Sequence, residues 1–302
     1  MKNQYNGSWL TILKNSGNKL NGLQSFVIMP YRGISYGKAV TPANDFNGTI
    51  SHYLHVVRDQ NAPYPAILYP SADTYLVFCR DNDDRHRSFL VGPRSLPRIG
   101  EYVTDDTEYF VVGLSQAGSY AFWPMNQNEL TDKSFPLNDI FPKWAVPLTE
   151  KINVASGFNA KVSAFEHFLK GHFDKLRFME NDSAKELTHL SVAGDYNQYI
   201  KHVKGLNYTE RHRRRLFLKY TGVAPKKFLQ IIRGQSALKM MSAQPERPLT
   251  EIAYNLDYYD QAHFINEFKS LYETTPLQFI KDFLSHSKND LTETECKPNF
   301  TN

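Results

Sequence analysis

Two short segments in the last third of the sequence concentrate side chains that could contact a polyanion. In 209–221, Arg214 and Arg215 follow Arg211 at three and four residues, so a helix would carry all three on one face. Guanidinium groups bind phosphate and guanine through paired hydrogen bonds, so this face is suited to nucleic acid. Runs of arginine also occur on ordinary solvated faces and on RNA-binding faces, and the residues alone leave these alternatives open.

The second segment, 260–272, has a polar face of a different kind. Phe264, Phe268 and Leu271 recur at i, i+4 and i+7, which predicts a helix with an apolar inner side. The opposite face is short and free of carboxylates, and it suits the major groove of DNA, where amide and imidazole groups meet base edges. Its residues are Gln261, Ala262, His263, Asn266, Lys269 and Ser270. An ordinary helical hairpin with a solvated side would give the same pattern.

Local signals predict the elements that position these faces. The Thr209 hydroxyl and the Asp260 carboxylate can each accept a hydrogen bond from a backbone N–H in the first turn of the helix that follows. Before the second segment, 249–256 has the apolar side of a short helix, and 257–258 makes a corner. This arrangement predicts a helix-turn-helix.

A longer predicted helix joins the two segments. Pro225 opens it in the first turn, where a missing N–H costs nothing. Gly234 is expected to interrupt it. The apolar side of this helix consists of Phe228, Ile231, Ile232, Leu238 and Met241. A rigid connector would hold recognition helices starting near 209 and 260 in successive major grooves, about 34 Å apart.

Segment 249–283 resembles the second helix-turn-helix of AraC/XylS-type transcription regulators. The matching residues are Glu251-Ile252-Ala253, Tyr258, Asp260-Gln261-Ala262-His263-Phe264, Glu267-Phe268-Lys269 and Thr275-Pro276. Segment 209–225, TERHRRRLFLKYTGVAP, resembles the first recognition helix of the same family. The resemblance implies a bacterial, sequence-specific transcription regulator that binds promoter DNA, is more often an activator, and works with RNA polymerase.

The same resemblance assigns roles to the exposed side chains. The three arginines would read the first groove, the amide and imidazole groups would read the second, and Thr209 and Lys269 would contact phosphate. The residues implied to contact DNA are Thr209, Arg211, Arg214, Arg215, Gln261, Ala262, His263, Asn266 and Lys269.

Three residues depart from the family pattern. Asp257 and Glu273 stand at corners where glycine is usual, so both are expected to adopt a left-handed backbone that glutamate tolerates poorly. Arg213 stands where a core leucine is usual, and its stem is expected to run along the core edge. If these departures weaken DNA contact, the alternative function is a helical interaction protein that binds RNA polymerase or another regulator.

The first half of the chain is strand-like, with short apolar runs separated by turn residues. The predicted strands are 26–29, 50–57, 66–69, 75–79, 89–91, 109–112 and 120–123. No helix of crossover length separates them, so we predict an antiparallel sandwich or barrel. Residues 130–140 are predicted to form a loop and a short turn.

A helical pattern follows, with Phe165, Leu169 and Phe173 at intervals of four. Segment 130–141, LTDKSFPLNDIF, and the helix after it resemble the end of an effector domain attached to some AraC relatives, which implies a sensing domain that could bind a small-molecule effector. The helix could pair with its counterpart in a homodimer or cover the open side of the sheet, and the sequence does not decide between these roles.

Composition is that of an ordinary globular protein, with 41% hydrophobic and 22% charged residues among 302. The net charge of +4 is uneven: 1–184 has 18 basic and 18 acidic residues, 185–285 has 15 and 10, and 286–302 has 2 and 3. The excess lies in the segment with the recognition helices, as phosphate attraction requires. No apolar run is long enough for a membrane span, and no signal-peptide core is present, so we predict a cytoplasmic protein.

We find no residue set for catalysis, a metal or a cofactor. His52 and His55 would point to opposite faces of a strand, and Cys79 and Cys296 are too few and too distant for a zinc site. The mixed-charge run 80–87 is typical of a hairpin loop. We therefore expect no enzymatic activity.

The predicted fold class is α+β in two domains. Residues 1–145 would form the β-rich sensing domain, 146–184 a helical connector and linker, 185–285 an all-α double helix-turn-helix domain, and 286–302 a disordered tail.

Overall fold

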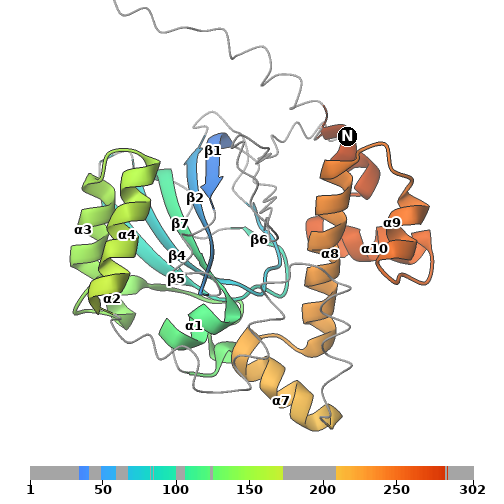
Figure 1. Cartoon of the computed structure of the whole chain (residues 1–302), viewed down its shortest axis with the longest axis horizontal. Helices are drawn as coiled ribbons and strands as arrows, with labels where there is room; N and C mark the ends of the chain where they lie inside the picture. The colour runs from blue at the N-terminus through green and yellow to red at the C-terminus, as the bar shows by residue number, and fades with distance from the viewer. Residues whose placement is uncertain are drawn as a thin grey trace, which may run out of the picture.

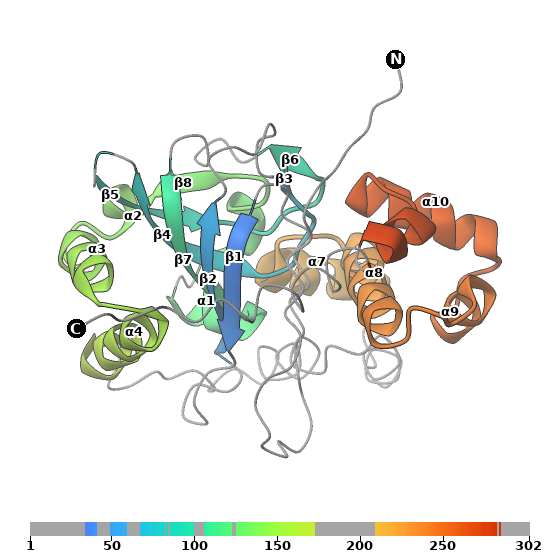
Figure 2. The same ribbon diagram turned by 90° about the horizontal axis from the view of Figure 1, so that it is seen from above.

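The computed structural model describes residues 34–40, 49–58, 67–81, 83, 85–99, 106–122, 125–172, 209–282 and 284. An antiparallel sheet lies in the middle of the molecule. Helices α3 (Ala145–Val154) and α4 (Phe158–His172) are on one side of it, and the helices of the carboxyl-terminal part are on the other (Figures 1 and 2). The predicted α+β fold, with a β-rich amino-terminal domain, trailing helices and a helical carboxyl-terminal domain, is confirmed.

All strand pairs in the described residues are antiparallel. The main sheet has the order β1-β2-β7-β4-β5-β8, and β3 pairs with β6 in a second sheet. The strands are β1 (Ile34–Val40), β2 (Ile50–Arg58), β3 (Ile67–Leu68), β4 (Thr74–Asp81), β5 (His86–Val91), β6 (Arg98–Ile99), β7 (Asp106–Leu114) and β8 (Ser134–Pro136). The predicted strands at 50–57, 66–69, 75–79, 89–91 and 109–112 are confirmed.

The edge strand β8 corrects the predicted loop over 130–140. Gly92 N donates to Lys133 O at 3.0 Å, and Phe135 then pairs with Leu90 of β5. Helix α2 (Leu137–Ile140) follows directly. A strand of three residues has too short a pattern to be recognised, because its pairing depends on an edge supplied by a distant segment.

The predicted strand at 120–123 is also wrong, because Tyr120 to Phe122 belong to helix α1 (Gln116–Phe122). Ser115 begins this helix. Its Oγ accepts a hydrogen bond from Gly118 N at 3.0 Å, and its carbonyl accepts one from Ser119 N at 2.7 Å. A serine cap thus outweighs the strand propensity of an aromatic run. The 3-10 helix η2 (Gln127–Glu129) follows α1.

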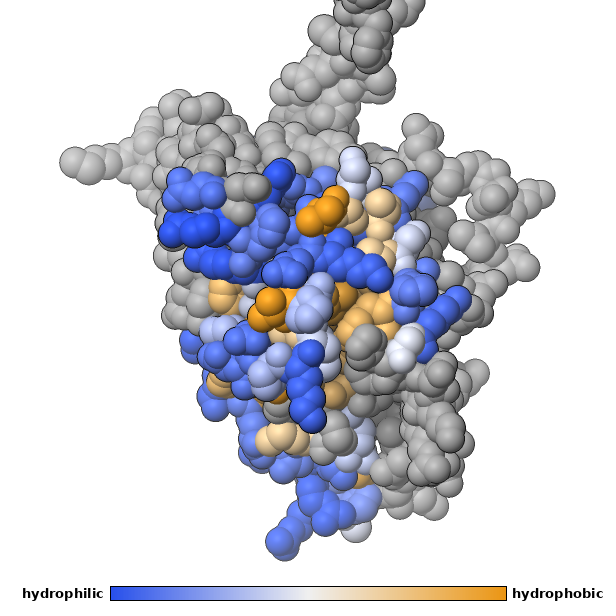
Figure 3. Space-filling model, turned by 90° about the vertical axis from the view of Figure 1, so that its left-hand side faces the viewer, coloured by the Kyte–Doolittle hydropathy of each residue, from blue (hydrophilic) through white to orange (hydrophobic). Residues whose placement is uncertain are grey.

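Helix α4 covers the sheet with its apolar side. Phe165 and Leu169 are both 0% exposed, and the ring of Phe165 lies 6.1 Å from Tyr53 of β2. Its outward positions include the exposed residues His167 and Lys170. Figure 3 views this side of the molecule and shows a mainly hydrophilic surface with scattered hydrophobic residues. The structure therefore shows α4 in one of its two predicted roles, as a cover for the sheet.

A buried ion pair attaches α4 to the sheet. Lys161 Nζ is 3.3 Å from Glu108 Oε1 of β7, and His55 Nε2 is 2.8 Å from the same oxygen. The hydrogen bond from His55, together with the charges of Lys161 and His55, lowers the pKa of Glu108 to about 2 against the effect of burial. His52, three residues earlier in β2, lies on the other face beside Tyr75, so the predicted separation of the two histidines is confirmed.

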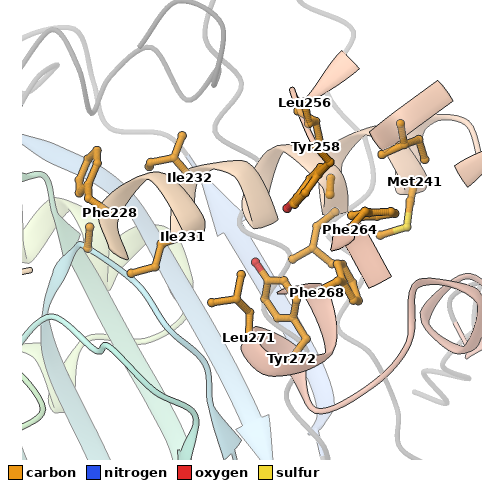
Figure 4. Packing of buried hydrophobic residues seen from close by; sticks show 14 of the residues in the cluster. Phe228, Ile231, Ile232, Met241, Leu256, Tyr258, Phe264, Phe268, Leu271 and Tyr272 are labelled. Carbon is orange, nitrogen blue, oxygen red and sulfur yellow. The ribbon is translucent and has the colours of Figure 1, made fainter. Parts of the chain in front are cut away.

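Four helices of the carboxyl-terminal part share one apolar core: α7 (Glu210–Thr221), α8 (Pro225–Ala243), α9 (Leu249–Asn255) and α10 (Gln261–Tyr272). Figure 4 shows Phe228 and Ile231 of α8 in this core, with Phe264 and Phe268 of α10 towards its other end. Helix α7 lies at one end of α8, and α9 and α10 lie alongside α8 away from that end (Figure 1).

Some predictions concern residues outside the described ranges. These are the strand at 26–29, the end of the connector and linker at 173–184, the start of the double helix-turn-helix domain at 185–208 and the tail from 286, with Cys296. Cys79 is 1% exposed, in keeping with a core thiol. Among the described helices, none combines the length and apolarity that crossing a membrane requires.

Candidate nucleic-acid interface

Helix α7 presents three of its four arginines to solvent. It begins after Thr209, whose side chain accepts a hydrogen bond from His212 N at 3.3 Å, so the predicted cap is confirmed. Arg211, Arg214 and Arg215 are all exposed. Arg215 Nη2 lies 3.3 Å from His212 Nδ1, which leaves the rest of the guanidinium open to a ligand.

The opposite side of α7 is buried. Phe217 and Tyr220 are 2% and 3% exposed, and Phe217 makes an edge-to-face contact with Phe228 at 5.5 Å. Gly222 ends the helix with φ of 74°, a conformation that favours glycine. The side chain of Arg213 lies outside the described residues.

Helix α10 has the same construction. The Asp260 carboxylate accepts a hydrogen bond from His263 N at 2.7 Å, which confirms the second predicted cap. Phe264 and Phe268 are 0% exposed and anchor the inner side. On the outer side Gln261 is half-buried, and the exposed residues are Ala262, His263, Asn266 and Lys269. Each predicted contact residue is therefore at the surface of α7 or α10.

The two unusual corners have the expected backbone. Asp257 and Glu273 both have φ of 54°, in the left-handed region. Glu273 ends α10, and its N–H donates to Lys269 O at 2.9 Å. Both turns therefore form without glycine. A left-handed backbone costs a residue with a Cβ about 1–2 kcal/mol relative to the right-handed conformation.

Helix α8 is continuous over 19 residues, so the interruption predicted at Gly234 is wrong. A Cβ at this position would lie 2.7 Å from Leu271 Cδ1 and 2.9 Å from Tyr272 Oη. Gly234 therefore allows α10 to pack closely against α8. At a rise of about 1.5 Å per residue, the 19 residues of α8 span about 28 Å.

Comparison with protein-family models matches residues 203–282 to a family described as a helix-turn-helix domain. The matched range contains α7, α8, α9 and α10 with both exposed faces. Residues 203–282 form an AraC-type helix-turn-helix domain.

Individual relatives cover this chain to different extents. An uncharacterised HTH-type transcriptional regulator of Haemophilus influenzae is 34% identical over 67 residues, which is 22% of this chain and 22% of that protein. ToxT from Vibrio cholerae O395 is 14% identical, with 72% of this chain and 91% of that chain covered and a TM-score of 0.38. ToxT from strain SCE256 with a bound unsaturated fatty acid is 15% identical, with 70% and 88% covered and a TM-score of 0.32.

A buried ion pair inside the AraC-type domain connects α8 to α10. Arg233 Nε and Nη2 donate to the two carboxylate oxygens of Glu267 at 3.1 and 3.2 Å, and the guanidinium carbon lies 4.3 Å from the ring centre of Tyr258. The sequence analysis missed this pair. The sequence does contain a sign of it. Glu267 lies three residues after Phe264, on the inner side of α10, and a buried carboxylate at such a position requires a cation as its partner.

A second feature missed by the sequence analysis is a polar cluster in the β-rich domain. Ser51 Oγ lies 2.9 Å from His52 Nδ1 and donates to Asp73 Oδ2 at 3.0 Å, and Gln116 Nε2 donates to Asp73 Oδ1 at 3.0 Å. His52 is 2% exposed, and burial lowers its pKa to about 4. Within the described residues, no cluster of three or more metal-binding side chains occurs.

Proposed function

We propose that the chain is a sequence-specific DNA-binding transcription regulator that places α7 and α10 in successive major grooves of one duplex. The observation that carries this proposal is a pair of capped helices, each with an exposed face free of carboxylates beyond its first turn, that one continuous α8 holds apart. Helix α7 packs on Phe228 near the start of α8, and α10 packs on Arg233 and Gly234 in its middle. The length of α8, about 28 Å, is of the same order as a groove repeat of about 34 Å.

The side chains divide by chemistry. Arg211, Arg214 and Arg215 would bind guanine edges and nearby phosphate in the first groove, because a guanidinium offers paired donors. In the second groove the Gln261 amide would bind adenine. Asn266 and His263 would meet neighbouring base edges, and Ala262 could contact a thymine methyl group. Thr209 and Lys269 would contact phosphate and set the position of each helix.

Selection of bound sequences from random duplexes tests this function. We expect two half-sites one helical turn apart. Arg215→Ala should then weaken binding by about 1–3 kcal/mol and relax base preference at one position of the first half-site, and Gln261→Ala should do the same in the second. If neither substitution changes base preference, the assigned roles are wrong.

Two matched controls separate base recognition from charge. Arg215→Lys keeps the positive charge but loses the paired donors, so it should keep the salt dependence and lose preference for guanine. Lys151→Ala removes an exposed charge on α3, far from both recognition helices, and should leave the affinity unchanged.

The alternative function, a helical interaction protein, is favoured by apolar side chains on the surface of the AraC-type domain. Tyr254, Tyr259 and Leu277 are 82%, 93% and 55% exposed. These residues are also where a regulator could contact RNA polymerase. Direct DNA binding must weaken steeply with added salt, whereas a protein contact through these residues need not. Activation of transcription, a small-molecule effector and a homodimer stay predictions from the family resemblance.

A further inference from the structure

The β-rich domain contacts the carboxyl-terminal end of α7. The rings of Tyr120 in α1 and Tyr220 in α7 lie 4.7 Å apart, edge to face. Lys219 Nζ lies 5.3 and 5.0 Å from the centres of these two rings. The Thr131 hydroxyl donates to Gly222 O at 2.6 Å.

Gly222 brings the backbones of the two domains close together. A Cβ at this position would lie 2.6 Å from Thr131 Oγ1, 2.9 Å from Gln127 O and 3.0 Å from Pro93 Cγ. A side chain larger than hydrogen would therefore push the β-rich domain away from the end of α7. The β-rich domain therefore contacts the backbone at the end of α7, in addition to the side chains of Lys219 and Tyr220.

A separate contact reaches the carboxyl-terminal end of α10. Tyr69, next to β3, places its ring 5.7 Å from that of Tyr272. Tyr272 is 3% exposed, and Ala72 of the β-rich domain is buried in the same apolar cluster as the helices. The β-rich domain thus contacts both recognition helices, at positions separated by α8.

These contacts leave the proposed DNA-binding faces open. Tyr220 follows Thr209 by eleven residues, which corresponds to about 16 Å along the helix axis. Tyr272 lies at the end of α10, while Gln261 and His263 lie in its first turn. The β-rich domain therefore contacts each recognition helix at its carboxyl-terminal end, whereas the proposed base-reading residues lie in its first two turns.

We propose that the β-rich domain is a second brace, in addition to α8, that fixes the spacing and relative orientation of the two recognition helices, with Tyr69, Tyr120 and Thr131 as its positioning residues. This inference rests on the proposed function. Helix α8 contacts α7 through Phe217 and Phe228, and it contacts α10 through Gly234 and the Arg233–Glu267 pair. A second contact on each module, away from the axis of α8, opposes rotation of that module about α8.

The brace is itself connected to the sheet. Thr131 Oγ1 is 3.3 Å from Gln127 O, and the Gln127 side chain accepts a hydrogen bond from Ser119 Oγ. Ser119 Oγ lies 2.8 Å from Thr74 Oγ1 at the start of β4. This chain of hydrogen bonds transmits the rigidity of the sheet to the end of α7.

The test is the dependence of binding on half-site spacing, measured with the full chain. Each duplex carries both selected half-sites at the selected spacing or with one base pair inserted between them. For the unsubstituted chain the insertion should weaken binding strongly, because it moves and rotates one groove relative to the other. In a Tyr69→Ala/Tyr120→Ala variant the ratio of the two dissociation constants should fall about tenfold, a size typical of coupling between sites. Thr131→Val should lower the ratio in the same direction.

Conservative variants and single half-sites provide the controls. Tyr120→Phe and Thr131→Ser keep the ring and the hydroxyl, so they should keep the spacing ratio. Affinity for a duplex with one half-site should be the same in all variants, because the recognition faces are untouched, and this also shows that each variant is folded. If folded Thr131→Val and the double variant keep the original ratio, the brace is wrong while the proposed function stands. Failure of the unsubstituted chain to bind any duplex in a salt-dependent way would overturn both.

Discussion

Replacing Arg233 by methionine is expected to destabilise the AraC-type domain strongly. The side chains of Arg233 and Glu267 are 14% and 5% exposed, and two hydrogen bonds join them. Methionine fills similar space but leaves the Glu267 carboxylate buried without its cation, a change that costs about 3–5 kcal/mol in comparable cases. We expect the lower end of this range, about 3 kcal/mol. The His263 side chain is 49% exposed, and its Nε2 lies 3.9 Å from the same carboxylate, so a second polar group stays near Glu267 when Arg233 is removed. A loss of this size is a large part of a total stability of about 5–15 kcal/mol.

Urea unfolding measures this effect through the midpoint at unchanged slope. The double variant Arg233→Met/Glu267→Met removes both charges, so it should recover at least half of the loss. Arg247→Met is the matched control. It removes an arginine from an i,i+4 pair with Glu251 whose side chains are 26% and 49% exposed, and it should cost less than about 1 kcal/mol.

Two results would refute this reasoning. If Arg233→Met lowered the free energy of unfolding no more than Arg247→Met, the claim that Glu267 needs Arg233 to offset its burial would be wrong. The loss would come from packing around Tyr258, and not from an unpaired charge, if the double variant were as unstable as the sum of the two single variants.

Two further substitutions test local features. Glu273→Gly should raise the free energy of unfolding by about 1 kcal/mol, because glycine adopts the left-handed backbone of φ 54° without steric cost; a lower melting temperature would contradict this. Burial lowers the pKa of His52 from 6.5 to about 4, so its contribution to stability is complete above pH 6.5 and is lost as the pH falls towards 4. Over this window the unsubstituted chain should lose up to about 3 kcal/mol more than His52→Asn in urea unfolding, and parallel curves would refute it. Burial raises the pKa of Asp73 to about 6, so its protonation acts in the opposite direction, but it acts in both proteins and leaves their difference unchanged.

The proposed recognition helices were accessible from sequence because their determinants are local. Thr209 and Asp260 cap the helices they precede, and each acts on an N–H within one turn. The spacing of Phe264 and Phe268 sets which face of α10 is buried, and the remaining positions then face outward. The left-handed corner at Asp257 agrees with the family resemblance, in which glycine is usual at this position.

Two of the errors of the sequence analysis originate in distant contacts, and the third combines a local cap with a distant contact. Gly234 does not interrupt α8, because glycine there permits the approach of α10 from more than thirty residues away. Strand β8 forms because β5 offers it an edge. Helix α1 forms where an aromatic run favours a strand, since the Ser115 cap and packing against α7 outweigh that propensity.

By itself the sequence determined the two amphipathic helices, their caps and the polar faces that we propose contact DNA, because periodicity and capping act within a few residues of chain. Only the tertiary structure decided how those faces are held. The partnership of Arg233 with Glu267 and the contacts of Tyr69, Tyr120 and Thr131 with the ends of α10 and α7 join residues far apart in the chain. Such contacts depend on how whole elements pack, and a single sequence carries no local pattern that specifies them.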